Sequence, residues 1–175
     1  NGKINWFINL NQSLDLNPSN LFNSNPIVLH NDKIAIATQD KLYFLNTNNG
    51  ATIFQFDISS LMSPIVTNDN ILLITANSLL VCINTNNGKI NYSIDINFEI
   101  AKFLDVKEKE IVIRSFSILN NNIFLFLQNS YILEFENNGK LLDISKLPAK
   151  LNTSPIFIND SLIYFDKKNR VIISN

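Results

Sequence analysis

Two side chains with distinctive chemistry stand in this sequence, and both lack the neighbours that a reactive site needs. His30 is the only histidine, so it would have to be the base of any Ser-His-Asp triad and the sole imidazole of any zinc site. No cysteine or second histidine stands near it at metal-ligand spacing. The single cysteine, Cys82, lies in the apolar run 80–83, which is typical of a buried thiol. We therefore expect no catalytic and no metal-binding residue.

Glycine is scarce, and positive charge is not in excess. The four glycines form no glycine-rich phosphate loop, and no Gly-x-Ser-x-Gly turn presents a nucleophile. The formal net charge of -1 argues against non-specific nucleic-acid binding, which depends on clustered lysine and arginine. The sequence predicts neither a cofactor nor a nucleic-acid partner, and it favours a binding protein over an enzyme.

The composition is that of a folded domain. Hydrophobic residues make up 46% of the 175-residue chain and charged residues 17%, which is enough to build a sizeable core. No run of 18 apolar residues predicts a transmembrane helix. The chain opens at Asn1 without a methionine or a signal peptide and is strand-like within a few residues. We therefore expect the native protein to begin further upstream.

Internal repeats dominate the sequence. A pattern of Pro-Ile-Val, a short Asn-containing turn, two apolar strands and Asn-Asn-Gly begins at Pro26 and again at Pro64, 38 residues later. Gly50 and Gly88, which end the two copies of Asn-Asn-Gly, are also 38 residues apart. A third copy ends at Gly139, and two partial copies flank the three. Copies and partial copies lie at 1–10, 20–58, 61–96, 115–144 and 152–174.

Each copy resolves into four short strands. The last strand alternates apolar and polar residues, as a half-buried strand does; its apolar positions are Ile4, Trp6, Ile8 and Leu10 in the first partial copy, and Ile90, Tyr92, Ile94 and Ile96 later. The inner strands are almost continuously apolar, which predicts burial on both faces; they lie at 34–38, 42–45, 72–75 and 79–83. Asn-Asp and Asn-Asn-Gly tolerate positive φ and close hairpins. The fold class is therefore all-β.

The insert at 97–115 interrupts the repeat. It predicts an extra hairpin with strands at 98–104 and 111–114, joined by the alternating charges of 107–110. Such a charge run is typical of a solvated turn. The alternative is a docking element on one rim of the domain.

Four-stranded units repeated about every 40 residues predict a β-propeller of antiparallel four-stranded blades. A β-sandwich would not explain the repeat. About four blades are present, as part of a larger seven- or eight-bladed ring, as a closed four-bladed ring or as a half that pairs with another. Residues 1–10 could supply the outer strand to the unfinished unit at 153–173. An open half would expose the faces of its end blades, so we expect such a half to self-associate.

An aromatic residue follows the glycine by four positions in three copies: Trp6 after Gly2, Phe54 after Gly50 and Tyr92 after Gly88, while Asp143 breaks the pattern after Gly139. This Gly-x-x-x-aromatic skeleton resembles the PQQ-like repeat of quinoprotein propellers. The resemblance implies that these aromatics dock one blade onto the next. Enzymatic quinoproteins hold their cofactor with several tryptophans, a cysteine pair and acidic Ca²⁺ ligands. One tryptophan and one cysteine do not supply that set.

Within this superfamily, the order of landmarks along the chain is similar to the BamB family of outer-membrane assembly lipoproteins. The landmarks are NGKINWFINL, SNPIVLHNDKI, SPIVTNDNILLI, ILNNNIFLFLQNSYILEF and LPAKLNTSPIFINDSLIYFD. The resemblance implies a periplasmic scaffold at the outer membrane, anchored by lipid on an upstream cysteine. It also implies contact with a BamA-like barrel-assembly protein and with unfolded outer-membrane proteins.

The resemblance assigns the partner contact to a Ser-Leu-x-Leu-Arg loop. Ser13 is followed here by Leu14 and Leu16, which match, and by Asn17 where the family has arginine. An asparagine does not provide a planar cationic fork. Leu14 and Leu16 could instead pack beneath their own loop.

The sequence therefore supports one main hypothesis and two alternatives. The main hypothesis is a non-catalytic periplasmic scaffold that supports the assembly and insertion of outer-membrane β-barrel proteins. The first alternative is a fragment of a quinoprotein-type dehydrogenase. The second is a generic propeller that serves as an interaction or sensor domain.

Overall fold

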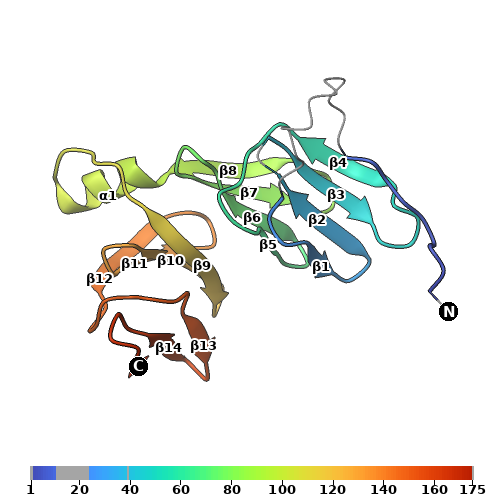
Figure 1. Cartoon of the computed structure of the whole chain (residues 1–175). Helices are drawn as coiled ribbons and strands as arrows, with labels where there is room; N and C mark the ends of the chain where they lie inside the picture. The colour runs from blue at the N-terminus through green and yellow to red at the C-terminus, as the bar shows by residue number, and fades with distance from the viewer. Residues whose placement is uncertain (1, 11–23, 39, 175) are drawn as a thin grey trace, which may run out of the picture. The chain divides into compact units, whose positions relative to one another are not determined.

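The computed structural model describes residues 2–10, 24–38 and 40–174 (Figure 1). The predicted partner loop, with Leu14, Leu16 and Asn17, lies outside these residues. The chain divides into two compact units, 1–91 and 92–175, with the division inside strand β8. Each unit contains short antiparallel strands in sequential order. No described helix is long and apolar enough to cross a membrane.

Two four-stranded sheets begin in the first unit. The first sheet has the order β1 (Val28–His30), β2 (Lys33–Ala37), β3 (Leu42–Asn46) and β4 (Thr52–Phe56). The second sheet has the order β5 (Ile65–Val66), β6 (Asn70–Ile74), β7 (Leu79–Asn84) and β8 (Ile90–Asp95). The inner strands β2, β3, β6 and β7 contain the fully buried residues. The four predicted inner strands are confirmed.

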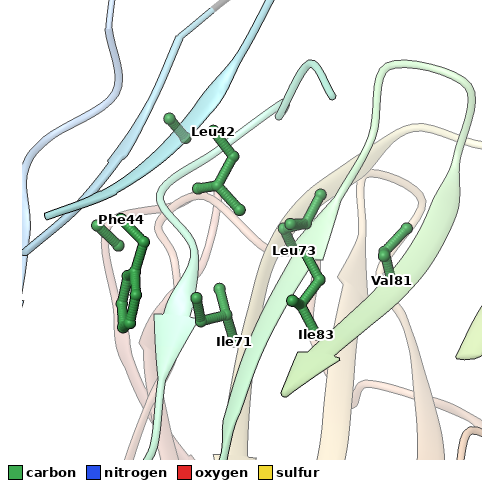
Figure 2. Packing of buried hydrophobic residues seen from close by; sticks show 8 residues of the cluster. Leu42, Phe44, Ile71, Leu73, Val81 and Ile83 are labelled. Carbon is green, nitrogen blue, oxygen red and sulfur yellow. The ribbon is translucent and has the colours of Figure 1, made fainter. Parts of the chain in front are cut away.

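The core of the first unit lies between the facing sides of these two sheets (Figure 2). The first sheet contributes Ala35, Ala37, Leu42 and Phe44, and the second contributes Ile71, Leu73, Val81 and Ile83. The Phe44 ring also stacks on Phe54 of β4, with centroids 4.8 Å apart. Because the apolar positions are two residues apart along each strand, they share one face. Burial of each of the six larger side chains stabilises the fold by about 1.5–3 kcal/mol, and each alanine contributes less.

The second unit contains two further sheets. The third sheet has the order β9 (Ile113–Leu119), β10 (Asn122–Leu127), β11 (Tyr131–Glu136) and β12 (Leu141–Lys146). The fourth sheet has three described strands, β13 (Ile156–Ile158), β14 (Ser161–Phe165) and β15 (Val171–Ser174). The core of the second unit lies between these two sheets and contains Phe126, Leu147, Leu151, Leu162 and Tyr164.

The hairpin turns have the backbone conformation that their residues predict. Gly50, Gly88 and Gly139 all have positive φ, at 69°, 68° and 89°. Asn31 and Asn159 also lie in the left-handed region, which asparagine tolerates better than most residues. The predicted turn chemistry is therefore confirmed at these positions, whereas Asn68 and Asp69 of the second copy do not have positive φ.

The predicted hairpin at 97–115 is wrong in its first half, because Ile96–Leu104 forms the helix α1. The Asp95 carboxylate accepts the N–H of Phe98 and caps the amino end. At the other end, Asp105 adopts the left-handed conformation and the Val106 N–H donates to the Ala101 carbonyl, as in a Schellman cap. Both caps satisfy backbone groups that a strand would have left to a partner. The second predicted strand, 111–114, overlaps only the start of β9.

Residues 2–10 differ from the predicted outer strand, since they belong to none of the described sheets. They are held to the first unit by side chains. The indole N–H of Trp6 donates to the Thr47 carbonyl at 2.7 Å, and the Tyr43 hydroxyl donates to the Leu10 carbonyl at 3.4 Å. Ile4 and Ile8, predicted to share the inward face with these two, are exposed.

Candidate interaction surfaces

Each aromatic residue of the repeat lies on the turn glycine of the following copy. A Cβ atom added to Gly50 would lie within 2.7 Å of the Trp6 ring, and one added to Gly88 within 3.3 Å of Phe54. One added to Gly139 would meet Ile94 and would lie 3.1 Å from the Tyr92 ring. These glycines therefore serve two purposes, positive φ and close approach of an aromatic ring. The contacts join consecutive repeats at the positions to which the resemblance assigns docking.

The insert presents the most apolar exposed surface of the second unit outside its sheets. Helix α1 packs against β12, with Ile96 and Ala101 buried. Five apolar side chains of the insert remain exposed, namely Phe98, Phe103, Leu104, Val106 and Val112. We refer to these five as the insert surface. Exposed apolar side chains gathered in one segment are typical of a partner site.

A cavity of about 560 Å³ lies beside the insert surface. Its lining comes from the end of the insert, the β10–β11 turn and two lysines: Glu110, Ile111, Val112, Gln128, Asn129, Ser130, Lys150 and Lys167. The buried Ser130 hydroxyl accepts the Leu151 N–H at 2.9 Å and so fixes one wall. The lysines lie in exposed positions and face a single glutamate, so the cavity carries little net charge. Its chemistry is that of a polar rim beside an apolar surface.

Asp166 is a buried carboxylate whose role is structural. It accepts the backbone N–H groups of Lys168 and Arg170 at the β14–β15 turn. The Arg170 guanidinium donates to it through Nε and Nη2, at 2.8 and 2.6 Å. The side-chain hydrogen bond from Arg170 is the main cause that lowers the pKa of Asp166 below its ordinary value. Every acceptor direction faces the turn, so the carboxylate stabilises this hairpin.

His30 and Cys82, the two side chains with distinctive chemistry, lie among residues that form a turn and the core of a sheet. His30 Nε2 lies 2.9 Å from the Asn68 amide oxygen, at the turns that precede β2 and β6. Cys82 is buried in β7, so the predicted buried thiol is confirmed. Across residues 2–10, 24–38 and 40–174, no three acidic, cysteine or histidine side chains gather as a metal site would require.

Repeated antiparallel sheets, with one aromatic–glycine contact from each copy to the next, define a partial β-propeller. No family model matches the sequence, and no curated protein matches it. Among solved structures, the chain is similar to BamB from Moraxella catarrhalis, with 13% identity and a TM-score of 0.67 over 85% of this chain and 42% of that one.

Two other solved structures share the fold. The computationally designed protein Ika4 matches with 10% identity and a TM-score of 0.64, over 86% of this chain and 89% of that one. Hsv2 from Kluyveromyces lactis matches with 10% identity and a TM-score of 0.55, over 85% of this chain and 43% of that one. These likenesses confirm the predicted all-β propeller fold. The chain spans less than half the length of the BamB and Hsv2 chains.

Sequence reasoning missed the insert surface. Ile96, Ile100 and Ala101 recur with helical spacing after Asp95, which is a favourable capping residue. That signal marks a helix with one buried face. It does not show that Phe98 and Phe103 point away from that face, because both also fit an apolar strand.

Proposed function

We propose that the protein is a non-catalytic scaffold for the assembly of outer-membrane β-barrel proteins at the periplasmic face of the membrane. The observation that carries the proposal is the similarity of its fold to BamB from Moraxella catarrhalis. The described residues favour binding over catalysis, because His30 contacts Asn68 at a turn and Cys82 is buried in β7. The partner in this proposal is a BamA-like protein, and the full-length scaffold is anchored by lipid.

The contact with the partner uses apolar side chains. The resemblance assigns it to Leu14 and Leu16, with Asn17 in place of the family arginine. The insert surface is a second apolar region, and two of its five side chains are phenylalanines, a residue type that is enriched in the cores of protein interfaces. We therefore propose that the insert surface extends or replaces the contact made by the loop.

A second candidate function is a generic propeller interaction domain. It is favoured by the TM-scores of Ika4 and BamB, which are 0.64 and 0.67 and so nearly equal. A fold shared with a designed protein carries no functional information by itself. In this case the insert surface would bind a partner other than a BamA-like protein.

The deciding experiment measures the affinity of this chain for the periplasmic domains of a BamA-like protein by biolayer interferometry. Three variants are compared: Leu14→Asp with Leu16→Asp, Leu104→Asp, and Leu61→Asp as the matched control. Leu104 and Leu61 are equally exposed, each at 49%, but only Leu104 belongs to the insert surface. A charge placed within an apolar contact is expected to weaken binding by about tenfold or more.

Each outcome favours a different interface. Weakening by the double Leu14/Leu16 variant alone places the contact on the loop, and weakening by Leu104→Asp alone places it on the insert surface. Binding that Leu61→Asp weakens as strongly as the others is non-specific. Absence of binding by a folded chain leaves the generic interaction domain as the better hypothesis.

A further inference from the structure

The cavity beside the insert surface is lined by two lysines that form no ion pair with a carboxylate of the described residues. Lys150 lies on the link between the third and fourth sheets, and Lys167 lies on the turn between β14 and β15. The Lys167 N–H donates to the Lys150 carbonyl at 3.0 Å, which holds the two residues together. Two ammonium groups that line one cavity without a counterion favour an anionic ligand.

The repeat does not require lysine at these two positions. The second and fourth sheets align without a gap on the five-residue strands β6 and β14 and on the backbone hydrogen bond that closes the turn after each. The alignment places Ser59 and Ala76 at the positions of Lys150 and Lys167. The positive charge is therefore a feature of this cavity and not of the repeat.

The insert supplies a second wall of the cavity, formed by Glu110, Ile111 and Val112. Two hydrogen bonds fix this wall. The Ile111 N–H donates to the side-chain oxygen of Asn97 at 3.3 Å, and the Gln128 N–H donates to the Val112 carbonyl at 2.8 Å. Because the wall is already fixed, a ligand does not lose binding free energy by ordering it.

The turn between β10 and β11 adds neutral hydrogen-bond donors to the lining. Ser130 is 3% exposed, and its hydroxyl oxygen accepts the Leu151 N–H, so the hydroxyl hydrogen is left to donate. The side-chain oxygen of Asn129 accepts the Tyr131 N–H at 3.4 Å, which leaves its amide hydrogens. Ammonium, hydroxyl and amide donors in one cavity suit a carboxylate, which only accepts hydrogen bonds.

The cavity is continuous with the insert surface, because Val112 belongs to both. A ligand that fills the cavity therefore also contacts an exposed apolar side chain. Such a ligand combines an anionic group with apolar groups. A polypeptide segment with an acidic residue among apolar ones has this chemistry, and so does an anionic lipid.

The charges of the insert favour the polypeptide. Residues 97–112 contain three lysines and four acidic residues, so this segment is negatively charged overall. An anionic membrane surface would repel it. A single acidic side chain avoids most of that repulsion, because it enters the cavity beside the two lysines.

We propose that the cavity binds an acidic side chain of a partner polypeptide whose neighbouring apolar residues lie on the insert surface. Lys150 and Lys167 hold the carboxylate, and the Ser130 hydroxyl donates to it. A cavity of about 560 Å³ has room for one such side chain and the atoms next to it. This assignment rests on the proposed role of the insert surface in protein binding, and it adds the chemistry of the segment that is bound.

An NMR titration with two matched peptides tests the proposal. The probes are acetyl-Leu-Glu-Phe-amide and acetyl-Leu-Gln-Phe-amide, whose blocked ends leave the glutamate as the only carboxylate. The amide shifts of Val112, Gln128 and Ser130 in the isotope-labelled chain report binding at the cavity. We expect the glutamate peptide to bind about threefold to thirtyfold more tightly at low salt, as two exposed ion pairs predict.

Two double variants separate the cavity from the general charge of the chain. Lys150→Gln with Lys167→Gln should abolish the preference for the glutamate peptide. Lys107→Gln with Lys109→Gln is the matched control, because it removes the same charge from exposed residues of the insert that do not line the cavity. The control should keep the preference, and circular dichroism shows whether both variants are folded.

A third variant should act in the opposite direction, which a damaged fold would not do. Glu110 is the one acidic residue of the described lining, so it repels a bound carboxylate. Glu110→Gln should strengthen binding of the glutamate peptide by about twofold to fivefold and leave the glutamine peptide unchanged. Raising the salt from about 0.01 M to about 1 M should remove the preference in the wild-type chain.

Several results would overturn the proposal. They are equal affinity of the two peptides for the wild-type chain, a preference that persists without Lys150 and Lys167, and cavity amides that neither peptide shifts. Phosphatidylglycerol vesicles provide a further comparison. Vesicle binding that requires both lysines, without a preference between the peptides, would assign the cavity to an anionic lipid instead.

The periplasmic domains of the BamA-like protein distinguish a failure of this proposal from a failure of the proposed function. If these domains bind through Leu104 and the variant lacking Lys150 and Lys167 binds them equally well, the cavity has no such role and the scaffold function stands. If the peptide preference is present and the domains do not bind, the cavity assignment stands and the scaffold function fails.

Discussion

The first and fourth sheets have the same strand register and very different surroundings. Phe44 and Ile173 occupy equivalent positions, yet Phe44 is fully buried and Ile173 is largely exposed. Both positions are apolar because the repeat pattern requires it, whichever neighbour is present. The comparison shows that the sequence pattern specifies which face is apolar, while burial depends on the neighbouring sheet.

Truncation of Phe44 and Ile173 tests this comparison, and it is the test with the largest expected change in the free energy of unfolding. Phe44→Ala should lower the free energy of unfolding by about 3–5 kcal/mol, because it leaves a cavity in a closed core. Ile173→Ala should lower it by less than about 0.5 kcal/mol in a sample dilute enough to be monomeric. Urea denaturation followed by circular dichroism measures both. Similar losses for the two variants would show that the fourth sheet is already covered in the monomer.

The turn glycines are expected to give the next largest effect. Gly50→Ala should cost more than about 1–2 kcal/mol, the penalty of a left-handed alanine, because its Cβ also meets the Trp6 ring. Gly88→Ala should cost less, since Phe54 leaves it more room. Gly2→Ala is the matched control, with no atom near the added Cβ. Thermal melts of the three variants check this order, and an equal effect at Gly2 would refute the docking role.

The repeat was predictable because its signals are local. Alternating apolar residues and Asn-Asn-Gly turns specify strands and hairpins within a few positions, and β6 and β7 were located by them to within two residues. The close approach of Trp6 to Gly50 is different, because it joins residues far apart in the chain. The resemblance predicted only that Trp6 docks one blade onto the next, and neither the resemblance nor the pattern identified Gly50 as its contact.

The insert shows why the rest was not predictable. Phe98 and Phe103 satisfy either an apolar strand or an amphipathic helix, and the caps at Asp95 and Asp105 decide between the two. Local spacing identifies the helix once the caps are recognised. Which of its apolar residues remain exposed depends on the packing of α1 against β12, and no local pattern contains that information.

The turn between β14 and β15 differs from its equivalent in the first sheet, and the difference makes its stability depend on pH. In the equivalent turn of the first sheet, the Thr38 hydroxyl accepts the Lys41 N–H, so the fourth sheet differs by having a charged acceptor, Asp166. Because its pKa is lowered in the folded protein, the stabilisation is full above the ordinary carboxyl pKa of about 3.9 and is lost as the pH falls below it.

Asp166→Asn retains a side-chain oxygen that accepts the backbone N–H groups of the turn, and it removes the charge. The difference in Tm between wild type and Asp166→Asn should be constant from about pH 7 to pH 5 and should shrink below about pH 4. Asp166→Thr, which restores the acceptor of the first sheet, should show the same pH profile as Asp166→Asn. A Tm difference that persists unchanged at about pH 2 would attribute the effect to packing rather than to charge.

The variants with the smallest expected effect on stability distinguish the roles of the two exposed surfaces. Val112→Asp and Val171→Asp should each change the free energy of unfolding by less than about 0.5 kcal/mol, because both side chains are largely exposed. The two variants should impair different binding events. Val171→Asp should impair only the self-association that is expected of an open half-propeller, whereas Val112→Asp should impair only the binding of the outer-membrane assembly partner. If either variant impairs both, one surface serves both partners, and self-association then competes with the scaffold function.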